Sequence, residues 1–300
     1  MIIIRNRIIF FAISALLALG SLGALFTYGL EAGTDFTGGS LAEVRYEGAR
    51  PETSMLTKQL ESAGFHGFSL RESGDNGYTL RAATLTNEQR GNLASILSSE
   101  TSAANISQLS EVGPTIGVEL RNKAYVAVGL VLLCILLFIA FAFRKVSKPI
   151  SSWVYGLIAL VTLGFDVLIP LGFFAVLGHY VGVQVDTLFV TAILTILGFS
   201  IHDTIVVFDR TRENLRINEE KGRREDFAET TGRSINQTFV RSINTSLTVF
   251  LTLVALYMLG PVSTEYFALT LLVGIIAGTY SSIFLATPLL VVVERWRAKK

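Results

Sequence analysis

The sequence predicts an α-helical integral membrane protein with six transmembrane helices and an α+β domain inserted outside the membrane. The first observation behind this prediction is composition, because 51% hydrophobic residues and a mean hydropathy of +0.53 are too apolar for an ordinary soluble domain. The second is a set of six apolar runs that approach or exceed the length a helix needs to cross a bilayer. The third is the alternation of basic and base-free connections between these runs.

The six apolar runs define the expected membrane-spanning helices. They cover residues 8–30, 124–143, 153–177, 187–208, 238–259 and 266–293. Arg5 and Arg7 precede the first run, as basic residues do in a secretory signal peptide. At about 22 residues this run exceeds the apolar core of a signal peptide, so we expect a retained membrane anchor.

The basic residues orient the chain in the membrane. They gather at Arg5 and Arg7, at Arg144, Lys145 and Lys148, within 210–233 and within 295–300, which all lie in alternate connections. The two short opposite connections, 179–186 and 260–265, contain no lysine or arginine. This positive-inside pattern places both termini in the cytoplasm.

The predicted organisation follows from this orientation. Residues 1–30 form the cytoplasmic N-terminus and first helix, 31–123 an extracytoplasmic domain, 124–293 the other five helices, and 294–300 a cytoplasmic tail. The cytoplasmic connection 210–233 is charged and rich in helix formers, so we expect a solvated helix that also fixes the topology. The alternative is a docking surface for a cytoplasmic partner or for anionic lipid headgroups.

The extracytoplasmic segment has the pattern of an independent α+β domain. Strands are expected at 40–47, 68–72, 78–83 and 106–112, and helices at 51–63 and 86–98. The glycine-rich stretch 74–77 predicts the turn between the middle strands. Thr86, followed two residues later by Glu88, marks the start of the second helix. The order strand-helix-strand-strand-helix-strand is typical of a ferredoxin-like split βαβ unit.

Several classes of function are disfavoured by what the sequence lacks. The net charge of +1 gives no basis for a nucleic-acid partner, and the single Cys134 excludes a disulfide within the chain. The three histidines are far apart and offer no metal-ligand spacing. The sequence has no phosphate-binding glycine loop with its lysine and no nucleophile elbow, so an enzyme is the least favoured class.

Two ionisable residues stand inside apolar runs. Asp203 lies in the fourth run, where a carboxylate is costly and usually faces a polar partner or water. Arg241 lies in the fifth, within a stripe of polar residues that recur every three or four positions on one helix face. The stripe comprises Ser234, Gln237, Thr238, Arg241, Thr245, Thr248 and Thr252. Hydrogen bonding between helices would explain the threonines well but the arginine poorly.

We therefore expect Asp203 and Arg241 to form a proton-responsive pair. A static buried ion pair is the alternative, but it adds little stability, because desolvating both charges roughly cancels their attraction. Burial favours the neutral acid whereas a nearby arginine favours the carboxylate, so a small change in their separation could switch the protonation state.

Other polar residues in the runs are secondary candidates. Asp166, near the middle of the third run, is either a second proton-coupling group or a structural partner within the bundle. His202 is either structural or a relay, because histidine titrates near neutral pH. Candidates for tuning the site are His202, Ser200, Gln237 and Thr245. Gly274 and Gly278 give the sixth run a small-residue face suited to close helix packing.

Four motifs resemble the SecD/SecF family of the resistance-nodulation-division superfamily. They are residues 33–40 (GTDFTGGS), 112–117 (VGPTIG), 198–214 and 234–246. The resemblance covers nearly the whole chain in the expected order. It implies a six-helix half of the superfamily type in the bacterial cytoplasmic (inner) membrane. Its expected partners are SecD, the SecYEG channel and unfolded preprotein, with YajC as a further candidate and lipids around the helices.

The resemblance implies use of the proton motive force in late steps of preprotein translocation. By motif, Asp203 matches the family's intramembrane aspartate, Arg241 its partner and Asp166 the aspartate usual in the third span. The family commonly has asparagine where this chain has His202. No cofactor is implied, and protons are the coupling ion. The alternatives are a proton-coupled small-molecule exporter subunit of the same superfamily and a non-conducting translocase scaffold.

Overall fold

The computed structural model describes residues 2–99, 102–143 and 150–298, and the chain divides into two compact units. The helical unit comprises Met1–Glu31, Val126–Gln184 and Leu188–Lys300. The α+β unit comprises Ala32–Tyr125 and Val185–Thr187. Of the bases used to orient the chain, Arg144, Lys145, Lys148, Lys299 and Lys300 lie outside the described residues.

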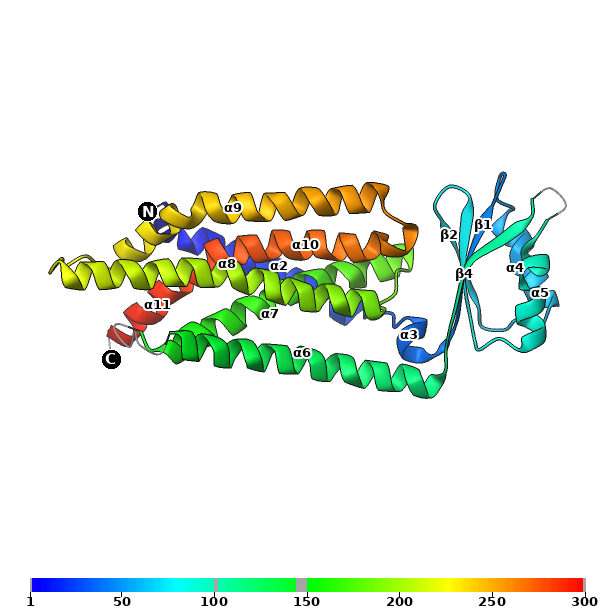
Figure 1. Ribbon diagram of the computed structural model, residues 1–300, viewed down its shortest axis with the longest axis horizontal. Helices are drawn as coiled ribbons and strands as arrows, with labels where there is room; N and C mark the ends of the chain where they lie inside the picture. Colours follow the sequence, from blue (N-terminus) through cyan, green and yellow to red (C-terminus); the bar gives the residue numbers. More distant parts are fainter. Residues whose placement is uncertain (1, 100–101, 144–149, 299–300) are drawn as a thin grey trace. The chain divides into compact units, whose positions relative to one another are not determined.

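Among the described residues, six helical segments are long and apolar enough to cross a membrane, as predicted. After the short α1 (Ile2–Arg5) come α2 (Arg7–Tyr28), α6 (Pro114–Ala142), α7 (Ser152–Val181), α8 (Thr187–Glu220) and α9 (Phe227–Leu259) (Figure 1). The sixth segment, Val262–Arg297, is built from several pieces. These are a 3-10 turn η1 (Val262–Thr264), α10 (Glu265–Ser281), a π-turn η2 (Ser282–Ala286) and α11 (Thr287–Ala298).

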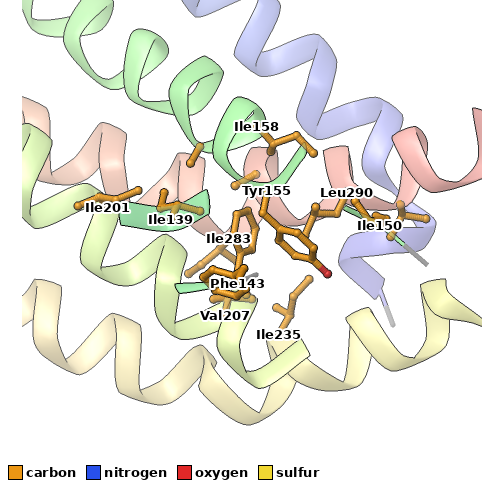
Figure 2. Packing of buried hydrophobic residues seen from close by; sticks show 14 of the residues in the cluster. Ile139, Phe143, Ile150, Tyr155, Ile158, Ile201, Val207, Ile235, Ile283 and Leu290 are labelled. Carbon is orange, nitrogen blue, oxygen red and sulfur yellow. The ribbon is translucent and has the colours of Figure 1, made fainter. Parts of the chain in front are cut away.

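A cluster of buried hydrophobic residues joins the helices of this unit (Figure 2). At its centre the ring of Tyr155 stacks on Phe143 at 5.2 Å between centroids and meets Phe208 edge-on at 5.3 Å. Ile139 from α6 and Ile283 from the π-turn are also buried there. Interlocked aromatic and branched side chains therefore hold α6, α7, α8 and the sixth segment together at this level.

The described segments at the N-terminus, between α8 and α9 and at the end of α11 lie at one end of the helical unit. Helix α1 contacts α9 and α11. Arg297 donates to the Ser151 hydroxyl at 3.5 Å, and Arg295 lies 3.8 Å from Asp226 in the α8–α9 connection. This arrangement agrees with the expectation that these segments share one side of a membrane.

The predicted connection 210–233 is mostly helical. Helix α8 runs on to Glu220 and α9 starts at Phe227, so residues 221–226 alone join them. A ladder of polar contacts explains the extension: Asn214 donates to Ser234 at 2.8 Å, and Asn218 and Arg233 each donate to Glu225 at 2.7 Å. The first contact joins α8 to α9, the second joins α8 to Glu225 in the connection, and the third joins Glu225 to α9. The two helices therefore continue as a hairpin.

The α+β unit contains the predicted elements in the predicted order. They are β1 (Gly39–Tyr46), α4 (Thr53–Ser62), β2 (Ser69–Ser73), β3 (Gly77–Ala82), α5 (Asn87–Leu97) and β4 (Ala104–Val112). The strands form an antiparallel sheet in the order β2-β3-β1-β4, and both helices cover one face of it (Figure 1). Thr86 is the N-cap of α5 and Glu88 lies in its first turn, as predicted, and Gln89 completes a capping box with Thr86.

The core of this unit lies between the sheet and the helices. Leu56 and Leu60 of α4 and Leu93 and Leu97 of α5 are fully buried against the inward-facing side chains of the strands. The Tyr46 hydroxyl donates to the Leu97 carbonyl at 2.8 Å, and burial raises the pKa of Tyr46 to about 12.

The motifs at 33–40 and 112–117 lie against each other. The first contains a short helix, α3 (Thr34–Thr37), and then Gly38 at a φ of 80°, in the left-handed region that favours glycine. A Cβ atom on Gly38 would lie 2.7 Å from Cα of Pro114. Asp35 of the same motif accepts a hydrogen bond of 2.9 Å from the backbone N–H of Thr187, the first residue of α8. The chain thus needs these glycines because two backbone segments approach closely.

The packing of α2 against α7 gives a stability prediction. A Cβ atom on Gly172 would lie 2.5 Å from Cα of Ser21, whereas no heavy atom lies within 4 Å of that position on Gly164. Gly172→Val should lower the free energy of unfolding in detergent by about 1–3 kcal/mol, because the helices must separate. Gly164→Val on the same helix is the control and should cost clearly less; equal costs would contradict this account of the packing.

The α8–α9 hairpin gives a pH prediction. Burial alone would raise the pKa of Glu225, but hydrogen bonds from Asn218 and Thr230 and the charges of Arg233 and Arg223 leave that pKa below its ordinary 4.5. Glu225 therefore stabilises the fold above pH 4.5, and this contribution is lost as the pH falls through the lower folded value. Thermal unfolding at neutral and acidic pH measures how much unfolding free energy is lost on acidification. Glu225→Gln should make this loss smaller by up to about 1 kcal/mol. Glu219→Gln, at an exposed position, should keep the wild-type pH dependence; a matching change there would refute the assignment.

Candidate functional site

Asp166 is buried in the helical unit with a hydroxyl as its partner. Its side chain is 0% exposed on α7, and it accepts a hydrogen bond from the Ser200 hydroxyl of α8. The other carboxyl oxygen, Oδ1, has no hydrogen-bond partner among the described residues. None of their Lys, Arg or His nitrogens lies within the 4.0 Å ion-pair distance of this carboxyl. A carboxyl without a counter-charge in an apolar bundle is costly, so it marks a functional candidate.

Asp203 lies in a similar setting, one turn after Ser200 on α8. It is 3% exposed and accepts a hydrogen bond of 3.3 Å from the Ser246 hydroxyl of α9. Ser246 in turn accepts a bond of 2.7 Å from Thr279 of α10. Helix α8 therefore presents Ser200 and Asp203 to the interior on one face, as their spacing of three residues requires.

Hydroxyl groups fill the space between the helices around the two carboxyls. Thr204 and Ser282 are hydrogen bonded at 2.8 Å, and Ser282 also donates to the Ser200 carbonyl at 3.3 Å. We call this set the buried polar cluster: Asp166, Ser200, Asp203, Thr204, Ser246, Thr279, Ser281 and Ser282. Ser282 begins the π-turn, where Thr287 donates to its carbonyl at 3.0 Å, and such turns are frequent at functional sites.

The close approach of α8 and α10 makes this cluster possible. A Cβ atom on Gly278 would lie 2.9 Å from Cβ of Ser200, and one on Gly274 would lie 2.1 Å from the Ile196 side chain. This confirms the small-residue packing face predicted for the sixth run. It also identifies the partner of that face as α8, which the sequence left open.

The expected ion pair between Asp203 and Arg241 is absent from the described residues, and this prediction is corrected. Arg241 is exposed on α9, while Ser242 and Ser246 of that helix face the interior. Ser246 follows Arg241 by five positions, which is a rotation of about 140° around the helix. The arginine therefore projects from the helical unit, and the serine takes its expected place at the carboxyl.

The other residues proposed for tuning are spread over several positions. Nδ1 of His202 lies 3.9 Å from Oδ1 of Asp203. The His202 side chain is exposed, whereas the Asp203 side chain is buried. Gln237 accepts hydrogen bonds from Arg210 at 2.7 Å and Asn214 at 2.9 Å, so it belongs to the α8–α9 hairpin. Thr245 donates to the Arg241 carbonyl at 2.9 Å. Of the tuning candidates, Ser200 donates a hydrogen bond to the buried Asp166 and His202 lies within ion-pair distance of the buried Asp203.

Sequence reasoning missed five members of the cluster: Thr204, Ser246, Thr279, Ser281 and Ser282. The sequence shows them as hydroxyl residues inside apolar runs. Such residues more often form hydrogen bonds within their own helix or to a neighbouring helix without further function. Across the described parts of the chain, no group of three or more His, Cys, Asp or Glu side chains is placed to hold a metal ion.

These features define the class of the protein. Six apolar helices, two carboxyls buried among hydroxyls and a separate α+β unit describe a multi-pass membrane protein with an ionisable interior.

Comparison with known proteins identifies the family. The signature described as "Protein export membrane protein SecD/SecF, C-terminal" matches residues 92–296. The chain is 40% identical to "Protein translocase subunit SecF" of Thermobaculum terrenum, over 96% of this chain and 92% of that relative. It is 36% identical to "Protein translocase subunit SecDF" of Thermus thermophilus, over 93% of this chain and 37% of that relative. The chain belongs to the SecD/SecF family of protein-export membrane proteins.

A solved structure agrees with this assignment. The crystal structure of SecDF, a translocon-associated membrane protein from Thermus thermophilus, matches with a TM-score of 0.85 and 34% identity. The match covers 97% of this chain and 38% of that one.

The contact between Ser200 and Asp166 gives a testable coupling. Ser200→Ala should cost about 1–3 kcal/mol of stability, because it leaves a buried carboxyl without its donor. In an Asp166→Leu background the same change should cost at least about 1 kcal/mol less, measured by unfolding in detergent. Thr195→Ala is the control, because this exposed hydroxyl bonds the backbone of its own helix. Additive effects of Ser200→Ala and Asp166→Leu would refute the contact.

Proposed function

We propose that the chain is a subunit of the Sec protein-export machinery that uses the proton motive force, together with SecD, to drive late steps of preprotein translocation. The observation that carries this proposal is the burial of Asp166 and Asp203 among hydroxyl groups at membrane depth. Membership of the protein-export family supports the process, and the two carboxyls support the energy source. Protons are the coupling ion in this proposal, which involves no enzymatic site and no cofactor.

The proposed setting is the bacterial cytoplasmic membrane, with both termini in the cytoplasm. The positive-inside pattern supports this orientation, and it places the α+β unit outside. For this unit we propose a ferredoxin-like fold. Its support is the element order βαββαβ together with the strand order β2-β3-β1-β4.

The proposed partner at the exposed side of α9 is SecD. Arg241 projects from the helical unit there, next to the exposed Thr248 and Thr252, which bond their own helix backbone. A charged and hydroxyl-bearing face is unfavourable against lipid, so a protein or a water-filled crevice should cover it. The Thermus thermophilus relative is named SecDF and is much longer than this chain, which favours SecD as that protein. SecYEG, YajC and the unfolded preprotein complete the proposed set of partners.

Protonation of Asp203 would drive the conformational change. The carboxylate attracts the guanidinium of Arg241, whereas the protonated acid is satisfied by the Ser246 hydroxyl. A proton that arrives from outside therefore weakens the pull on Arg241 and allows α9 to shift, and its release to the cytoplasm resets the site. Asp166, held by Ser200, is the proposed second proton-coupling group. Helix α6, which belongs to both units, is the proposed element that passes the shift to the α+β unit.

The available energy is sufficient for such a switch. One charge moved through 100 mV provides about 2.3 kcal/mol, and twice that potential provides roughly 4–5 kcal/mol. Moving a two-state equilibrium from about 1:99 to 99:1 takes roughly 5.5 kcal/mol. One proton per step therefore moves the equilibrium most of the way.

The test replaces the proposed proton-binding group. In membrane vesicles that contain SecD and the translocation channel, Asp203→Asn should abolish the stimulation of preprotein translocation by a proton gradient, because asparagine cannot titrate. The matched control is Asp209→Asn on the same helix, where the carboxylate is 65% exposed; it should retain the stimulation.

The outcome separates the alternatives. If Asp203→Asn keeps full stimulation and still assembles with SecD, the chain is a scaffold and the proton-coupling proposal fails. If the vesicles show proton-coupled export of small molecules without preprotein, the chain belongs to an exporter instead.

A further inference from the structure

The sheet of the α+β unit ends at β2. This strand pairs with β3 and is the terminal strand in the order β2-β3-β1-β4. In an antiparallel pair, alternate residues direct their N–H and C=O groups away from the partner strand. A terminal strand therefore offers a row of backbone donors and acceptors to another extended chain.

A cavity of about 300 Å³ adjoins this edge, between α4 and the start of β2. Helix α4 contributes Thr57 and Glu61 to its wall. The segment that leads into β2 contributes the rest: Phe65, His66, Gly67, Phe68 and Leu70.

The cavity has an apolar floor, but polar groups contribute the larger part of its accessible wall. Phe65 is 3% exposed and belongs to the domain core with Phe68 and Leu70, so these three form an apolar floor. Glu61 and His66 are exposed and stand at the rim. A pocket with an apolar floor and polar walls can hold a side chain and leave the backbone that carries it near the surface.

The strand edge and the cavity favour the same ligand. In an extended chain every second side chain points to one face. A chain that pairs with β2 would turn alternate side chains towards α4, where the cavity lies. A groove between an edge strand and a helix is the arrangement used in peptide recognition by strand addition.

The far end of β2 is already occupied within the domain. Arg50 forms an ion pair with Glu72 and donates to the Gly74 carbonyl at 3.2 Å. Such charged contacts limit uncontrolled pairing at a sheet edge. The half of β2 next to the cavity, around Ser69 and Leu70, is then the segment available for a ligand.

We propose that the α+β unit binds an extended segment of unfolded polypeptide by strand addition to β2, with one side chain of that segment against the apolar floor of the cavity between α4 and β2. Backbone pairing is independent of the ligand's sequence, and a single small cavity imposes a weak side-chain preference. This combination suits a protein that must handle many different chains. The inference rests on the proposed function, because the translocating preprotein is the unfolded polypeptide.

The first test uses the full-length protein in detergent and a fluorescent peptide of about ten residues with valine at alternate positions. Two companion peptides carry backbone N-methyl groups, one on the odd residues and the other on the even residues. Strand addition uses one edge of the peptide, so one companion should bind about tenfold or more weakly and the other like the parent. Equal affinity of all three peptides, or no binding of the parent, would overturn the proposal.

The second test fills the cavity. Thr57→Phe should weaken binding of the parent peptide about fivefold or more, because the new ring occupies the place of the ligand side chain. Lys58→Phe is the matched control on the same helix, at an exposed position outside the cavity wall, and should leave the affinity unchanged. An unchanged affinity for Thr57→Phe contradicts the proposed cavity. The methylated peptides need no variant, so they decide the case even if Thr57→Phe does not fold.

These outcomes can be separated from failure of the proposed function, because peptide binding needs no proton gradient. If Asp203→Asn abolishes the gradient stimulation but the protein binds no peptide, the strand-addition proposal fails and the proton-coupling proposal stands. If light scattering shows a dimer that the parent peptide cannot displace and Thr57→Phe disrupts, a second copy of the chain occupies the edge and the inference is wrong.

Discussion

The cost of placing two carboxyl groups inside an apolar helical unit governs the rest of that unit. Asp166 and Asp203 are almost fully buried, and hydroxyls from the neighbouring helices are the hydrogen-bond donors that reach them. These donors can reach the carboxyls because Gly274 and Gly278 let α10 approach α8 closely. A bundle built for stability alone would use apolar side chains here, since burying polar groups adds little to stability. This cost is the reason for proposing a functional role for the two carboxyls.

The cation nearest in role to these carboxyls is exposed. Arg241 lies on α9, the same helix as Ser246, and among the described residues it makes no ion pair with Asp203. The helical unit thus contains a neutral set of donors for the acids on its inside and a cation on its outside. Such a division suits a protein whose exposed polar face is completed by another chain, and the longer SecDF relative of Thermus thermophilus is consistent with that. The α+β unit has a different basis of stability, a hydrophobic core between one sheet and two helices.

Much of the fold could be predicted because its signals are local. Hydropathy over about 20 residues identifies a spanning helix, and alternation over a few residues identifies a strand. All six apolar segments and the strands and helices of the α+β unit follow from such patterns. The charged residues of 210–233 predicted a helix, and the structure confirms that most of this segment is helical, with Asn214 and Asn218 paired across α8 and α9. Thr86 correctly marked the start of α5, and Gln89 completes its capping box because the box needs a side chain three residues on.

The sequence alone determined that ionisable groups stand at membrane depth, because Asp166, Asp203 and Arg241 each interrupt an apolar run. The tertiary structure decided which partners they have. Whether Arg241 or Ser246 meets Asp203 depends on the rotation of α9, which is set by packing against α8 and α10. Likewise, Ser282, the first residue of the π-turn in the sixth segment, bonds Thr204 of α8. Contacts between helices join residues distant in sequence, and no spacing along one helix specifies the rotation of its neighbour.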